Sequence, residues 1–215
     1  MLIQHFKLMA AAVAAACAVM GVTLIASGGA VKGQDTEAPS YTDQGDLKPP
    51  SRYREWIYLT SGLDMSYSAK SGDGSMSMFD NVFVDPASYR SFLTTGTWPD
   101  KTMLVLEVRK AQSKGSINQL GHYQSNSMVG MEVHVKDEAR FPGKWAFFQF
   151  DSPTKDGKLL GQSAPCYSCH AAHGAVDTTF VQFYPMLLPL AEAKGTLSMA
   201  YRNEAQQLIQ RKSLD

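Results

Sequence analysis

Residues 128–136 read Met-Val-Gly-Met-Glu-Val-His-Val-Lys, and apolar and polar side chains alternate along most of this stretch. A period of two residues is typical of a half-buried β-strand, because successive side chains of a strand point to opposite faces. One face would carry Val129, Met131, Val133 and Val135, and the other would carry Glu132, His134 and Lys136. Similar signals predict three further strands, at residues 79–84, 102–108 and 144–150.

The segments between these strands indicate how the strands pair. Residues 111–127 and 151–165 are long and polar and show no helical crossover pattern, so we expect antiparallel pairing. Asp85 and Pro86 together predict the start of a helix that Gly96 ends, and Ser51 would cap a short helix that continues to Tyr58. Residues 192–214 also have helical composition. The sequence therefore predicts an α+β fold, mainly an antiparallel β-sheet with a few flanking helices.

Composition excludes two classes of protein. The chain has 215 residues, with 20 basic and 20 acidic side chains, and 44% of its residues are hydrophobic. A nucleic-acid-binding protein would normally carry a basic surplus, and an intrinsically disordered chain would have fewer apolar residues. We therefore expect a folded protein that has no nucleic-acid partner.

The first 50 residues differ in character from the rest. Residues 8–26 carry no charge and follow Lys7, which is the layout of a secretory signal. We expect residues 1–30 to form a signal peptide, or alternatively an N-terminal membrane anchor, and the protein to be periplasmic or secreted across the inner membrane. Residues 31–50 are rich in Gly, Ser, Asp and Pro and predict a flexible tether. Residues 51–215 would then form the functional domain.

The chemistry of the chain centres on Cys166-Tyr167-Ser168-Cys169-His170, a C-x-x-C-H sequence that is the attachment signature of a c-type haem. Two thiols at this spacing can each add to one vinyl group of the porphyrin, while the adjacent histidine becomes an axial ligand of the iron. A thioredoxin-like pair would need a surrounding βαβ pattern, and a zinc site would need two more soft ligands. The third cysteine, Cys17, lies in the leader. We expect one covalent haem c, held by Cys166 and Cys169 and ligated by His170.

The far side of the iron is less defined by the sequence. Electron-transfer cytochromes c usually place a methionine there, and only Met186 and Met199 follow the motif. Met186 lies in an apolar run, for which a core position is the default interpretation, and His173 is too close to His170 to reach the opposite face. Most of the chain precedes the motif. We therefore expect the upstream strands to build the distal pocket and expect an open, five-coordinate iron.

A longer series of motifs resembles a known family. In order, the series comprises Tyr53-Arg54-Glu55-Trp56, Val82-Phe83-Val84-Asp85-Pro86 with Tyr89, residues 96–102, Val129-Gly130-Met131-Glu132, Val135-Lys136-Asp137, Arg140-Phe141, Trp145-Ala146-Phe147, the haem motif and Phe183-Tyr184-Pro185. From about Tyr53 to Ala191 the chain resembles the cytochrome P-460 family, which includes the cytochromes c′-beta. The resemblance implies a mainly antiparallel β domain, often a homodimer, with a high-spin haem, a proximal histidine and a vacant distal site.

The resemblance also implies roles for single residues. Enzymes of the family oxidise hydroxylamine and link a lysine to the haem, whereas c′-beta members lack the link and bind nitric oxide or carbon monoxide. Glu132 matches a distal carboxylate of the enzymes that can accept protons. The pattern of residues alone would instead favour a solvated face for Glu132, His134 and Lys136.

Two positions depart from the enzymes. Leu106, before Glu107, stands where the linking lysine is expected, and leucine cannot form that link. Asp80 stands where the enzymes carry a distal arginine. Lys101 and Lys110 lie nearby, and both look like surface lysines at strand ends.

These observations give three functional hypotheses. The first is an exported cytochrome with an unlinked haem that binds nitric oxide, carbon monoxide or a nitrogenous ligand such as hydroxylamine. The second is a haem oxidoreductase that acts on hydroxylamine or peroxide, with Glu132 as the catalytic proton acceptor. The third is an electron carrier with a methionine ligand. A redox partner protein is expected for the redox functions.

Overall fold

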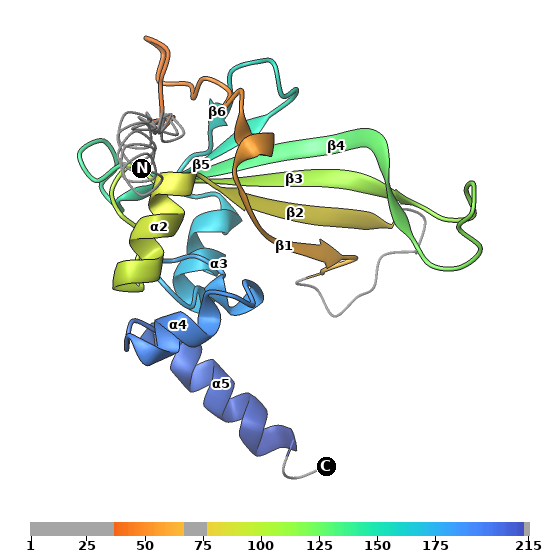
Figure 1. The fold of residues 1–215 in the computed structure, drawn as a ribbon. Coiled ribbons are helices and arrows are strands. Elements are labelled where there is room, and N and C mark those ends of the chain that lie inside the picture. Colours follow the sequence, from red (N-terminus) through yellow and green to blue (C-terminus); the bar gives the residue numbers. More distant parts are fainter. Residues whose placement is uncertain (1–36, 67–76, 213–215) are drawn as a thin grey trace, which may run out of the picture. The chain divides into compact units, whose positions relative to one another are not determined.

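The computed structural model describes residues 37–66 and 77–212, all of which belong to one compact unit. The chain order is η1 (Tyr53–Glu55), β1 (Ile57–Leu63), β2 (Met78–Val84), α2 (Pro86–Thr95), β3 (Met103–Gln112), β4 (Tyr123–Lys136), β5 (Trp145–Phe150), β6 (Lys158–Leu159), α3 (Pro165–His173), η2 (Val181–Phe183), α4 (Leu188–Ala193) and α5 (Met199–Lys212). The six strands form one sheet in the order of the sequence, and every neighbouring pair is antiparallel (Figure 1). This architecture confirms the predicted α+β class and the predicted antiparallel pairing.

Helix α2 begins and ends as the sequence predicts. Asp85 is its N-cap, and the carboxylate accepts a hydrogen bond of 2.8 Å from the backbone N–H of Ser88. Pro86 occupies the first turn, where the missing N–H costs nothing. Gly96 ends the helix at φ 75°, a left-handed conformation that glycine adopts without strain.

Two predicted segments differ from the structure, and a third agrees with it. The short helix predicted after Ser51 is only the 3-10 turn η1, and Ile57–Leu63 is a strand instead. The predicted polar connection 111–127 is shorter than expected, because β3 extends to Gln112 and β4 starts at Tyr123, so both ends of the segment are strand. Residues 192–212 are mainly helical, as their composition predicts, and contain the end of α4 and all of α5, separated by a short break.

The sheet separates two hydrophobic cores. The core that we call the N-terminal core combines one sheet face with residues before β1, and contains Leu47, Tyr53, Trp56, Met103, Val105, Met131, Val133, Val135, Phe141, Ala146, Phe148 and Phe150. The helix-side core combines the other face with α2 and the C-terminal segments, and contains Leu59, Val84, Phe92, Trp98, Leu104, Trp145, Ala175, Val176, Val181, Tyr184, Leu187 and Ala191. Figure 1 shows α2, α3 and α4 on that second side.

The segment before η1 is folded where it is described. Leu47 is fully buried, and its backbone exchanges hydrogen bonds with Gly157 at 2.8 and 2.9 Å. The later part of the predicted tether therefore packs onto the sheet, because an apolar side chain gains more by burial than the chain loses in freedom. The predicted leader lies outside the described residues. Within the described ranges, no helix is long and apolar enough to cross a membrane.

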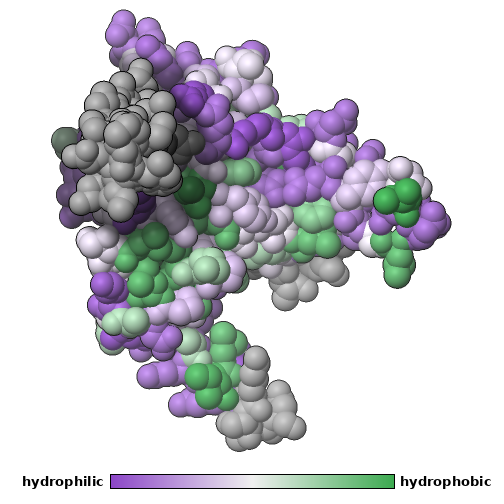
Figure 2. All heavy atoms as spheres, in the orientation of Figure 1, coloured by the Kyte–Doolittle hydropathy of each residue, from purple (hydrophilic) through white to green (hydrophobic). Residues whose placement is uncertain are grey.

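The hairpin of β3 and β4 extends beyond the rest of the sheet. Ile117 and Leu120, in its connection, are 93% and 92% exposed. Figure 2 shows apolar side chains at the end of this hairpin, next to polar ones.

Candidate haem site

Helix α3 carries all three residues of the predicted attachment motif. Pro165 occupies its first turn, and Cys166 and Cys169 follow three residues apart. Residues at this spacing lie on the same face of a helix, so the two thiols point to the same side. Both cysteines are free and half-buried. The structure therefore brings the two thiols and His170 together on one helix.

The ring of His170 is oriented by a backbone carbonyl. His170 Nδ1 lies 2.7 Å from the carbonyl oxygen of Thr178. A carbonyl can only accept, so Nδ1 carries the proton and Nε2 keeps its lone pair, which is the form that binds a metal. Burial lowers the pKa of His170 below its ordinary value, and the Thr178 carbonyl opposes the shift only in part. The imidazole is therefore neutral at neutral pH.

Aromatic rings surround this histidine. The ring of His170 lies 4.1 Å from that of Phe180, 4.6 Å from that of Phe147 and 5.0 Å from that of His134, measured between centroids. His134 is itself buried between Phe147, at 4.0 Å, and Trp145, at 4.4 Å. Burial, followed by the neighbouring His170, holds the pKa of His134 well below its usual range. His134 Nε2 has no hydrogen-bond partner among residues 37–66 and 77–212.

Tyr167, in the middle of the motif, ties α3 to the sheet. Its hydroxyl donates to the carbonyl of Leu160 at 3.0 Å and accepts from the backbone N–H of Phe147 at 3.4 Å. The two aromatic rings also meet edge to face, with centroids 4.9 Å apart. Because Phe147 also contacts His170, this anchor sets the distance between the histidine and the sheet.

Glu132 and Leu106 lie on the sheet face that carries His134. Leu106 pairs with Glu132 on β4 and with Val82 on β2, and paired residues point to the same face. Asp80 lies two residues before Val82 and so shares this face. All four side chains are half-buried. The position expected for the linking lysine is therefore occupied by a hydrocarbon side chain next to Glu132.

Glu132 is electrostatically coupled to Asp80 and to Cys166 of α3. Burial raises the pKa of Glu132, and the carboxylate of Asp80 adds to this shift. Burial raises the pKa of the Cys166 thiol as well, with Glu132 as the second cause. The solvated face that the pattern alone favoured is thus wrong, since Glu132 is half-buried and both His134 and Lys136 are buried. His134 lies against His170 of α3, and Lys136 lies against Asp177 in the turn that follows α3.

The remaining candidates are exposed to solvent. Lys101 and Lys110 are exposed, as expected, and Lys101 forms an ion pair with Asp137. Met186 is 75% exposed, so its default assignment to the core was wrong. Its run lies in the turn before α4, where Leu187 rather than Met186 faces the core. Met199 is 67% exposed, and the side chain of His173 is 54% exposed and paired with Glu204.

Comparison with known proteins shows to which family the chain belongs. The sequence model of the family described as Cytochrome P460 matches residues 50–181. The chain belongs to the cytochrome P460 family. This match confirms the resemblance inferred from the motifs, and no curated protein matches the chain.

Membership of the cytochrome P460 family implies a haem cofactor, and the residues described above fit that group. One helix presents two free thiols on one face and a neutral histidine whose Nε2 is available. The adjacent sheet face adds space, because a Cβ built on Gly130, two residues before Glu132, would meet no atom within 4 Å. Sequence reasoning missed Thr178 and Phe180. A backbone carbonyl leaves no mark in the sequence, whereas the aromatic residues shortly after the motif were a signal that could have been used.

Proposed function

We propose that this protein is an exported cytochrome with one covalently attached haem c, which binds a small neutral ligand such as nitric oxide or carbon monoxide at an open distal site. The observation that supports this most directly is the contact between His170 Nδ1 and the Thr178 carbonyl at 2.7 Å. It leaves Nε2 as the one ring nitrogen able to bind iron, on the helix that carries both attachment cysteines. Export rests on the charge-free leader at residues 8–26.

The bound haem would supply an iron centre able to bind a diatomic molecule. The chain's own residues would then determine which molecules reach it. Leu106 and Val82 offer hydrocarbon surface beside Glu132, which disfavours water and anions as competing ligands. The raised pKa of Glu132 keeps this carboxyl protonated to a higher pH than usual, and a protonated carboxyl can donate a hydrogen bond to a bound ligand.

The spectra of the purified holoprotein test this proposal. We expect a mass increase of one haem, a high-spin oxidised spectrum, and binding of carbon monoxide and nitric oxide to the reduced protein. A protein that bound neither gas would overturn the proposal, and a strongly red-shifted reduced band would show a lysine link in place of the unlinked haem. Met186→Leu is the matched control, since a side chain 75% exposed should leave every band in place.

Hydroxylamine oxidation is a second candidate, favoured by the position and pKa of Glu132. The reaction releases protons and passes electrons to an external acceptor, and Glu132 would be the proton acceptor. A base acts when deprotonated, so its raised pKa moves the rise of turnover with pH above the ordinary carboxyl value of 4.5. Glu132→Gln should abolish turnover and its pH-dependent limb while the haem stays attached. Unchanged turnover in this variant would remove Glu132 from the role.

A further inference from the structure

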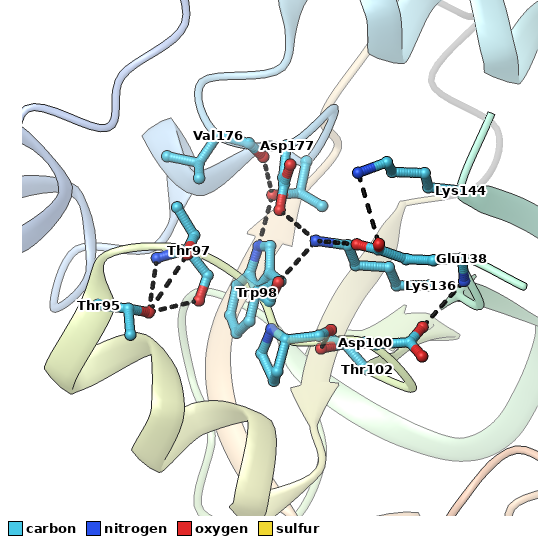
Figure 3. A network of polar contacts seen from close by, with 12 residues as sticks. Thr95, Thr97, Trp98, Asp100, Thr102, Lys136, Glu138, Lys144, Val176 and Asp177 are labelled. Atoms are coloured by element: carbon cyan, nitrogen blue, oxygen red, sulfur yellow. Dashed lines mark hydrogen bonds and ion pairs between the residues drawn. The ribbon is translucent and has the colours of Figure 1, made fainter.

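Lys136, at the end of β4, holds a buried positive charge within a network of polar contacts. Its side chain is 7% exposed. The ammonium donates to the carbonyl of Trp98 at 2.7 Å and to Asp177 Oδ2 at 2.8 Å, and Glu138 Oε1 lies 3.5 Å away (Figure 3). Burial of a charge is costly unless partners compensate for it, so this lysine strongly favours the conformation in which Asp177 and the Trp98 carbonyl stay in place.

Asp177 belongs to a tight turn whose backbone conformation is unusual. The N–H of Thr179 donates to the carbonyl of Val176 at 2.8 Å, and the two central residues, Asp177 and Thr178, have φ of 52° and 60°. Positive φ at both central positions is typical of a type I′ turn, which favours Asn, Asp and Gly. Thr178 is β-branched and disfavours this region, so the surrounding structure must hold the turn.

A second contact fixes the same turn from the side of α2. Trp98 Nε1 donates to Thr179 Oγ1 at 2.8 Å, and that hydroxyl donates to the carbonyl of Val176 at 2.6 Å. Trp98 thus meets the turn through its ring and meets Lys136 through its carbonyl, as Figure 3 shows. The ion pair between Lys136 and Asp177 is a further contact that holds this turn in place.

The turn directs one carbonyl towards the haem site. Thr178, next to Asp177, supplies the oxygen that accepts the hydrogen bond from His170 Nδ1. A hydrogen bond at the second ring nitrogen orients a metal-binding histidine and increases its electron donation to the metal. A change in the turn would therefore change the histidine through the Thr178 carbonyl.

We propose that Lys136 and Asp177 are positioning residues, whose ion pair holds the turn at 176–179 so that the Thr178 carbonyl stays hydrogen-bonded to His170 and sets its donation to the haem iron. This inference rests on the proposed function, in which His170 is the proximal ligand. It assigns to the pair an effect on the reduction potential and on the iron–histidine bond.

The experiment compares Asp177→Asn and Lys136→Met with the wild-type holoprotein. Asparagine keeps the preference for positive φ and removes the charge, and methionine keeps the length of lysine without the ammonium. We expect both variants to show a higher midpoint potential and a lower iron–histidine stretching frequency in the resonance Raman spectrum of the reduced protein. The double variant should show the same shift as each single variant, because each substitution removes the same interaction.

Lys144→Met is the matched control. Lys144 pairs with Glu138 at 3.5 Å in the same network and is 60% exposed, and in Figure 3 its contact runs to Glu138 rather than to the turn. Its substitution should leave the potential and the stretching frequency unchanged. Wild-type values for both quantities in folded Asp177→Asn would overturn the inference, and this variant decides alone if Lys136→Met does not fold, since Asp177 is 33% exposed. A wild-type protein with no iron–histidine stretch would overturn the proposed function as well, so the two failures are distinguishable.

Discussion

Gly174, the residue after α3, lies where no side chain fits. A Cβ at this position would come within 2.7 Å of the carbonyl oxygen of His170 and of the Cα and carbonyl carbon of Thr178. Its φ of −63° is ordinary, so the position needs glycine for space and not for conformation. We expect Gly174→Ala to lower the free energy of unfolding by about 1–3 kcal/mol, as overpacking against fixed backbone usually does.

Urea unfolding of the holoprotein measures this effect. Gly143→Ala is the control, because a Cβ there would meet nothing within 4 Å, and we expect it to change stability by less than about 0.5 kcal/mol. Equal unfolding free energies for the two variants would show that the loop after α3 can move away from the helix, contrary to the expectation.

Glu107 is the centre of a buried ionic cluster on the face opposite the haem site. Its side chain is 2% exposed, accepts hydrogen bonds from Tyr53 and Arg54, and pairs with Arg109 at 2.5 Å. Burial alone would raise the pKa of Glu107, but hydrogen bonds from Arg109 and Tyr53 outweigh it and the pKa is lowered. We expect Glu107→Gln to destabilise the protein by about 3–5 kcal/mol at pH 7, because Arg109 is left without its buried partner.

The lowered pKa of Glu107 also makes the free energy of unfolding depend on pH. The stabilisation is complete above the unfolded value of 4.5 and is lost as pH falls through the folded value, when the native carboxylate becomes protonated. Unfolding by urea between pH 7 and pH 3 should therefore show a smaller acid loss in Glu107→Gln than in wild type, and an identical loss would contradict this assignment. Glu55, 54% exposed and paired with Arg52, is the control, for which Gln should leave the free energy of unfolding close to that of wild type, because solvent screens an exposed pair.

Among the single residues of the candidate site, the sequence predicts some and not others. Cys166, Cys169 and His170 could be predicted as haem-binding residues because their chemistry needs fixed side chains at fixed spacing. The Thr178 carbonyl that orients His170 could not be identified, because any residue type supplies a carbonyl and only the folded turn aims it. Burial of His134 depends in the same way on Trp145 and Phe147 of the neighbouring strand.

Among the elements, β1 shows why a strand can be missed in a sequence. A register shift between Tyr58 and Thr60 interrupts its pairing with β2, so the buried residues Leu59 and Gly62 are three positions apart. The alternation of buried and exposed residues that identified β4 is therefore absent from β1. Helix α2 was predicted because Asp85, Pro86 and Gly96 act locally, without help from the rest of the fold.

The N-cap of α2 also ties this helix to the sheet. Asp85 is 1% exposed, and its two carboxylate oxygens accept from the N–H of Ser88 at 2.8 Å and from the N–H of Met103 at 3.2 Å. We expect Asp85→Ala to cost about 1 kcal/mol for the cap and about 1–3 kcal/mol for the unsatisfied buried N–H of Met103.

Thermal or urea unfolding followed by circular dichroism measures this cost. Asp85→Asn should lie between alanine and wild type, because one amide oxygen can retain the cap but the amide nitrogen cannot accept from Met103. Thr94→Ala, at an exposed position of the same helix, should stay within about 0.5 kcal/mol of wild type. A cost for Asp85→Ala no larger than that of Thr94→Ala would mean that water replaces both contacts.

For the whole molecule, the folded unit is larger than the matched family region. The match covers residues 50–181, yet Leu47 is buried in the N-terminal core, and Leu187 and Ala191 are buried in the helix-side core. Both cores thus use residues beyond the region by which the family is identified. Composition placed Leu47 in a tether because the segment around it is polar, and a single apolar residue gives no periodic signal.

The two cores lie on opposite faces of one sheet. A packing defect in one core should therefore lower the stability of the whole protein without changing the packing of the other core. Leu47 has no exposed surface and belongs to the N-terminal core, on the face away from His170. We expect Leu47→Ala to lower the free energy of unfolding by about 2–5 kcal/mol, through lost apolar burial and the cavity left behind. Leu208→Ala, at a side chain 51% exposed, should change it by less than about 0.5 kcal/mol.

The haem absorption bands of folded Leu47→Ala should match those of wild type, because the sheet backbone stands between the cavity and α3. Shifted bands in the folded variant would show that the sheet transmits packing defects across its faces, and the two cores would then have to be treated as one.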